Sequence, residues 1–108
     1  MVMTSQQYNR VTEEQVGIAV LQILANRPTG EATIAILQHE LPDHLGLSDA
    51  DRTQSITRPN EEIWEQQVRN LISHRTTEGN IIYERLADYI PDSHSIRITD
   101  AGRAHFMK

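Results

Sequence analysis

Residues 57–75 limit the possible folds more than any other stretch, because they form an amphipathic helical pattern with two contrasting faces. The apolar face recurs at helical spacing through Ile63, Trp64, Val68, Leu71 and Ile72. Asn60 is a favourable N-cap and Pro59 closes off the preceding chain, so we expect the helix to begin at Asn60. The apolar face predicts a place in the core, with Trp64 buried.

The opposite face carries side chains suited to reading DNA. Arginine can fork onto guanine, and asparagine or glutamine can pair with adenine. The candidate base contacts are Gln66, Gln67, Arg69 and Asn70. Candidate phosphate contacts are Ser73, Arg75 and Arg58, the last beside the N–H groups of the helix N-terminus. The alternative is an ordinary solvated face, since three glutamates between 61 and 65 would repel phosphate.

Two further helices precede this one. Thr12–Gln15 has the form of a capping box, so a core helix should start there and end at the turn-forming residues 26–30. A second helix should start near Ala32 or Thr33 and end or kink at Pro42. Residues 48–51 predict another acidic helical turn.

After the amphipathic helix the pattern changes to strands. Residues 81–83 (Ile-Ile-Tyr) and 95–98 (Ser-Ile-Arg-Ile) are predicted strands, separated by a loop over 86–94, and residues 99–103 should cap a short closing helix. The donors available on this hairpin for DNA are Arg85, His94 and Arg97.

This order predicts an α+β, mostly helical fold: a winged helix-turn-helix of three to four helices, a two-stranded wing hairpin and a short C-terminal helix. In that fold the helix before the hairpin can enter a major groove. Residues 1–11 show no apolar period, so we expect a flexible N-terminal segment before a winged-helix domain at 12–108.

Composition limits the function. The 108 residues suit one domain, no apolar run could span a bilayer, and the start lacks a signal-peptide pattern, so we expect a cytoplasmic protein with no membrane partner. The net charge of −5 argues against tight non-specific DNA binding. Residues 58–108 are nearly neutral, however, with seven basic and eight acidic side chains, which leaves room for a local positive face.

Nothing in the sequence predicts catalysis. There is no cysteine, the five histidines lack metal-ligand spacing, and no nucleophile–base pair or nucleotide loop is present. We therefore expect no enzyme, cofactor, metal or small-molecule substrate.

Three stretches resemble one known family, the amino-terminal winged-helix domain of Mrr-type restriction proteins. They are 45–52 (Leu-Gly-Leu-Ser-Asp-Ala-Asp-Arg), 64–71, and 96–103 (Ile-Arg-Ile-Thr-Asp-Ala-Gly-Arg). The resemblance implies a DNA-recognition module of a restriction system. Two departures are the lack of an Asp…Glu-x-Lys nuclease constellation and a longer, more acidic wing, so cleavage is not implied.

Two functions remain open. One is a winged-helix module that binds double-stranded DNA, as a small transcriptional regulator or a recognition subunit. The other is a protein–protein interaction module, an adaptor or dimerisation domain, that uses the wing apolars Tyr83, Leu86, Tyr89 and Ile90. A homodimer through residues 1–11 or the closing helix is compatible with either function.

Overall fold

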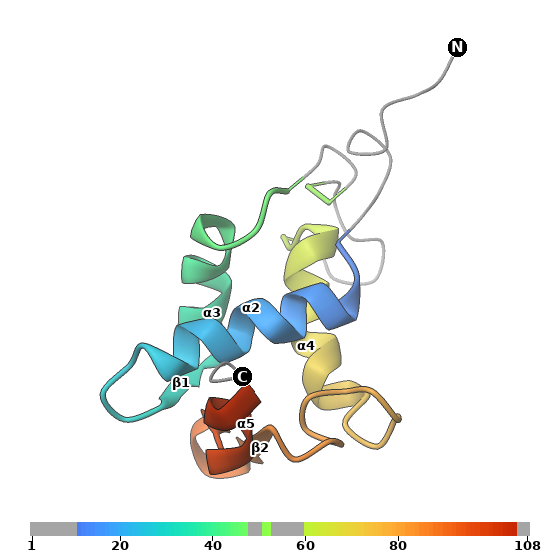
Figure 1. Ribbon diagram of the computed structural model, residues 1–108. Helices are drawn as coiled ribbons and strands as arrows, with labels where there is room; N and C mark the ends of the chain where they lie inside the picture. Colours follow the sequence, from blue (N-terminus) through green and yellow to red (C-terminus); the bar gives the residue numbers. More distant parts are fainter. Residues whose placement is uncertain (1–10, 48–50, 53–59, 106–108) are drawn as a thin grey trace.

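Four α-helices pack with a three-stranded antiparallel sheet in the computed structural model, which describes residues 11–47, 51–52 and 60–105. The elements are α2 (Glu13–Ala25), β1 (Glu31–Thr33), α3 (Ile34–Glu40), a 3-10 turn (Leu41–Asp43), α4 (Ile63–Ser73), β2 (Ala87–Ile90), a second 3-10 turn (Pro91–Ser93), β3 (Ser95–Ile98) and α5 (Asp100–His105). Figure 1 shows α2 lying across α3 and α4, with α5 and the sheet at one end. The predicted α+β class is confirmed.

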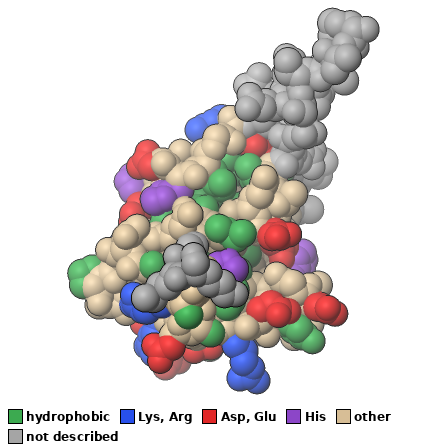
Figure 2. All heavy atoms as spheres, viewed as in Figure 1, with side chains coloured by type: hydrophobic (Ala, Val, Ile, Leu, Met, Phe, Trp, Pro, Cys, Tyr) green, Lys and Arg blue, Asp and Glu red, His purple; other side chains and the backbone are tan. Residues whose placement is uncertain are grey.

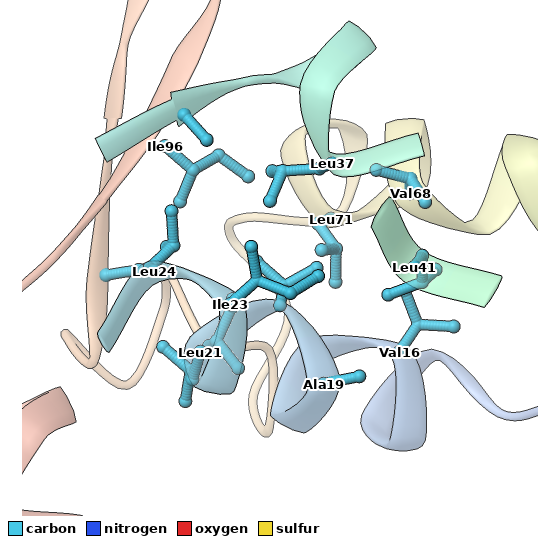
Figure 3. Packing of buried hydrophobic residues seen from close by; sticks show 14 of the residues in the cluster. Val16, Ala19, Leu21, Ile23, Leu24, Leu37, Leu41, Val68, Leu71 and Ile96 are labelled. Atoms are coloured by element: carbon cyan, nitrogen blue, oxygen red, sulfur yellow. The ribbon is translucent and has the colours of Figure 1, made fainter. Parts of the chain in front are cut away.

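α2 is the central helix of the core, as its apolar pattern predicts. Its capping box is present: Gln15 N donates to Thr12 Oγ1 (3.1 Å), and Thr12 N donates to Gln15 Oε1 (2.9 Å). Side chains of α2 meet Leu37 of α3, Leu71 of α4 and Ile96 of β3 (Figure 3). One continuous core therefore joins the helices to the sheet.

The start of α4 differs from the prediction. Asn60 is not the N-cap; it lies before the helix with a φ of 73°, and α4 begins at Ile63 after Glu62. An N-cap residue needs an extended backbone, and Glu62 has one. The backbone N–H of Glu62 donates to Glu65 Oε1 (2.9 Å). The buried position predicted for Trp64 is confirmed, since it is 4% exposed.

The sheet has one strand more than predicted. β1 pairs with β3, where Ala32 faces Ile96, and β2 pairs with the other side of β3, where Tyr89 faces Ile96. The strand order is β1-β3-β2. The hairpin of β2 and β3 is thus part of a three-stranded sheet, and only its second strand, β3, is one that we predicted. Three residues are too few to show an alternating pattern, so β1 carried no sequence signal.

Residues 81–83, predicted as a strand, form a turn instead. Asn80 Oδ1 accepts from Ile82 N (2.8 Å) and Tyr83 N (3.3 Å), and Asn80 Nδ2 donates to Leu71 O (3.0 Å). These bonds satisfy N–H groups that a strand would have paired with a neighbour. Arg85 follows with a φ of 63°, and β2 then occupies residues that we predicted to be loop.

Several predicted elements hold. α3 begins after the N-cap Thr33 and ends before Pro42; β3 and α5 match the predicted second strand and closing helix.

The predicted acidic turn lies outside the described residues except for Asp51. Asp51 is buried, and its Oδ1 accepts from Val11 N (2.8 Å) while its carbonyl accepts from Trp64 N (3.0 Å).

Candidate nucleic-acid interface

Arg69, the predicted guanine-reading residue of α4, is held by a carboxylate. Its Nε lies 3.0 Å and 2.8 Å from Oε1 and Oε2 of Glu61, whose side chain is only 14% exposed. Gln38 of α3 braces the pair by donating to Glu65 O (3.1 Å) and to Glu61 Oε2 (3.4 Å). The charge of Arg69 is therefore neutralised where base contact was predicted.

The amide side chains of α4 also have internal partners. Asn70 Nδ2 donates to Gln67 Oε1 (3.4 Å), and Gln67 Nε2 donates to Val11 O (3.4 Å). Gln66 is half-buried and likewise has an interaction partner. Ser73 is exposed at the C-terminal end of α4. The predicted base readers thus share one helix face, but they form contacts within the protein.

The donors predicted on the wing are also engaged. Arg97 of β3 lies between two carboxylates in the sheet register, facing Glu31 of β1 and Asp88 of β2. It forms an ion pair with Glu31 at 3.0 Å. His94, with a φ of 52°, has its Nδ1 3.1 Å from Tyr89 Oη. Both side chains therefore have partners within the sheet and its connecting turn.

Two other predicted contacts, Arg75 and Arg85, come together. Both line a hollow of about 530 Å³ between the end of α4, the turn over residues 81–85 and β2. Its remaining lining residues are Thr76, Ile82, Tyr83 and Asp88. Arg58, the remaining predicted contact, lies outside the described residues.

The guanidinium of Arg75 is held in place by two contacts. Arg75 Nη1 donates to Ile72 O (2.7 Å), and Arg75 Cζ lies 5.7 Å from the centre of the Tyr89 ring. Such a cation–π contact leaves the charge available to an anion while limiting the motion of the side chain. Arg85 is exposed, and its left-handed backbone is the kind of local strain that often accompanies functional positions.

The distribution of ion pairs separates these two arginines from most others. Within the part of the chain that the structure describes, Arg27, Arg52, Arg69 and Arg97 each pair with a glutamate. Neither Arg75 nor Arg85 forms an ion pair there. Asp88 is the one carboxylate in the lining of the hollow, and its partner across the sheet is Arg97. The hollow therefore holds two cations against one carboxylate.

Sequence reasoning missed the tyrosines as part of this site. Tyr83 is 48% exposed and lines the hollow. The ring of Tyr89 lies under the guanidinium of Arg75. Both were considered only as apolar wing residues for a protein contact. The available signal was that Tyr83 lies two residues before Arg85 in the sequence, but the strand predicted at 81–83 obscured it.

Other kinds of site have little support in the described residues. No three His, Asp or Glu side chains among them are grouped so that they could hold a metal ion. No helix in the same residues is long and apolar enough to cross a membrane.

Comparisons with protein-family models, curated proteins and solved structures gave no significant match to this chain.

Proposed function

We propose that the chain is a winged-helix DNA-binding module that contacts the backbone of duplex DNA, as a small transcriptional regulator or as the recognition subunit of a restriction-like system. The order helix, strand, helix, helix, strand, strand, with β3 between β1 and β2, is compatible with a winged helix. In that fold the third helix and the wing face the nucleic acid together.

The observation that carries the proposal is the meeting of Arg75 and Arg85 in one hollow between α4 and β2. Phosphate contacts from arginine position a protein on DNA without reading its sequence. Arg75 comes from the turn directly after α4, and Arg85 comes from the residues just before β2. They therefore lie beside the two elements that a winged helix turns toward DNA. Tyr83, which is 48% exposed, adds a phenol side chain to the same lining.

The engaged polar face of α4 supports a particular mode of binding. Arg69 would have to exchange Glu61 for a base, and the donors of Gln67 and Asn70 are already used. Binding should therefore depend mainly on phosphate contacts, with a steep loss of affinity as salt rises. Weak sequence preference is the expected consequence.

The alternative, a protein contact through the wing, has less support. That contact needs the four wing apolars exposed together, but only Tyr83 is exposed. Leu86, Tyr89 and Ile90 are half-buried, and Tyr89 is covered by Arg75.

An NMR titration of the ¹⁵N-labelled protein with a short mixed-sequence duplex at low salt tests the proposal. The largest amide shifts are expected at residues 75–76, 82–85 and 88–89. Only small shifts are expected in the turn around Arg27, which connects α2 to β1. Absence of any shift at low salt would refute DNA binding and favour the protein-interaction function.

A further inference from the structure

We infer that a second surface of this domain docks a partner protein, through a segment that presents an arginine or lysine beside an aliphatic side chain. The surface is a groove of about 310 Å³ formed by the first half of α2, the turn after α4 and the end of α5. Its apolar lining comes from Ile18, Leu71, Ile81 and Leu86, and its carboxylates are Glu13, Glu14 and Glu78. The other lining residues are Thr77, Gly79, Asn80 and His105, so three carboxylates stand against one histidine.

The apolar part of the groove is partly open to solvent. Ile18 is 36% exposed and is one of only two large hydrophobic side chains classed as exposed among the described residues. Beside it, Ile81 is buried and Leu86 is half-buried. An aliphatic side chain seated here would remove Ile18 from water, which favours association by the hydrophobic effect. The volume is near the lower end for ligand pockets, about 300–1,000 Å³, and suits one or two side chains.

The rim of the groove is acidic and has unused charge. Neither Glu14 nor Glu78 forms an ion pair or a side-chain hydrogen bond with any residue that the structure describes. Glu13 is fixed at the same rim, because its oxygens lie 2.6 Å from His74 Nδ1 and 3.3 Å from Asn80 Nδ2. Figure 2 shows acidic side chains beside apolar ones over α2 and the turn after α4. Charge complementarity therefore selects a cationic partner segment.

The groove is separate from the hollow of Arg75 and Arg85. The turn after α4 contributes residues 77–81 and Leu86 to the groove, but Arg75, Thr76, Ile82, Tyr83 and Arg85 to the hollow, and the two sites share no lining residue. The two sites are therefore distinct, although their linings are neighbours in the sequence. The inference stands independently of the proposed DNA binding.

Selection of random peptides displayed on phage against the full chain tests the inference. Enriched peptides should carry Lys or Arg within about two positions of an aliphatic residue. A selected peptide should bind the Glu14→Gln/Glu78→Gln variant about fivefold more weakly, as expected for the loss of two exposed ion pairs. Ile18→Ser should weaken binding similarly.

The matched control is Asp43→Asn/Asp92→Asn, which removes two exposed carboxylates that do not line the groove and should leave peptide affinity unchanged. Three results would overturn the inference. They are the absence of any enriched peptide, equal peptide binding to the groove variant and the control, and self-association of the wild type that Ile18→Ser abolishes. In the last case, the occupant is a second copy of the chain.

Discussion

Arg69 donates its Nε–H to both carboxylate oxygens of Glu61, at 2.8 Å and 3.0 Å, across eight residues of sequence. Glu61 lies just before α4, and Arg69 lies about two turns inside it. Because Arg69 is the only arginine in α4, this pair removes the helix's one cationic base reader from use. The acidic start of α4 thus competes directly with DNA for Arg69.

Glu61→Gln should raise the affinity for duplex DNA by at least about fivefold, since one good arginine contact contributes ~1–3 kcal/mol. The variant both frees Arg69 and removes a charge that repels phosphate. A double-mutant cycle separates the two effects: Arg69→Ala should lower the affinity of the Glu61→Gln variant more than that of the wild type. Fluorescence anisotropy with a labelled duplex measures all four affinities.

Glu40→Gln is the control for that cycle. It removes the same charge, but from the pair with Arg27 at 3.2 Å, away from α4. An equal gain in affinity from Glu40→Gln and Glu61→Gln would show that only net charge matters and that Arg69 is not released.

Tyr89→Leu should lower DNA affinity about threefold, because Arg75 loses the ring that holds its guanidinium, a contact of about 0.5–1 kcal/mol at exposed sites. Tyr89→Phe keeps the ring and loses only the hydroxyl near His94, so its affinity should match the wild type. Anisotropy titrations of both variants measure this difference. If Tyr89→Phe weakens binding as much as Tyr89→Leu, the ring does not hold Arg75 for DNA contact.

The elements that the sequence predicted well are those specified by neighbouring residues. The capping box of Thr12 and Gln15 joins positions three apart, and the buried Trp64 follows from helical spacing. The residues involved in each signal lie within one or two helical turns of each other, so the local sequence is enough to predict both features.

The errors involve pairings that are distant in the sequence. β1 is a strand only because β3, more than sixty residues later, pairs with it. The turn at 81–83 exists because Asn80 reaches back to Leu71 and caps the N–H groups after it, which overrides the β propensity of two isoleucines.

The internal partners of the predicted contact residues could not be read from the sequence for the same reason. Glu61 and Arg69 are eight residues apart, and helical spacing predicts side-chain pairs only at three or four residues. Arg75 and Tyr89 are fourteen residues apart, and their contact depends on the course of the turn between them. Residue types pointed to Arg75 and Arg85, but only the tertiary structure distinguishes them from the paired arginines.

Asn80→Ala should lower the free energy of unfolding by roughly 2–4 kcal/mol, because it removes a buried amide and leaves Leu71 O and the partly buried N–H of Ile82 without their partner. Asn26→Ala is the comparison. Asn26 is exposed and its side chain makes a single bond to Gln22 O, so the loss should stay below about 1 kcal/mol. Urea denaturation followed by Trp64 fluorescence measures both. Equal losses would contradict a structural role for the buried amide.

Gly102→Ala should destabilise the domain by about 1–3 kcal/mol, because a Cβ there would lie 2.1 Å from Leu86 O, a backbone atom that cannot move aside easily. Gly46→Ala introduces the same methyl group where nothing lies within 4 Å and should be near neutral. Thermal unfolding of the two variants gives the comparison. If their melting temperatures agree, the close approach of α5 to Leu86 is wrong.

The slope of log affinity against log salt concentration, for the wild type and Arg75→Gln/Arg85→Gln, tests the central claim most directly. Each phosphate contact contributes about 0.9 to that slope on duplex DNA, so the double variant should be shallower by roughly 1.8. Arg27→Gln/Arg97→Gln makes the same change in charge at two paired arginines and should keep the slope of the wild type. An unchanged slope in the Arg75→Gln/Arg85→Gln variant would show that the hollow does not bind DNA phosphates.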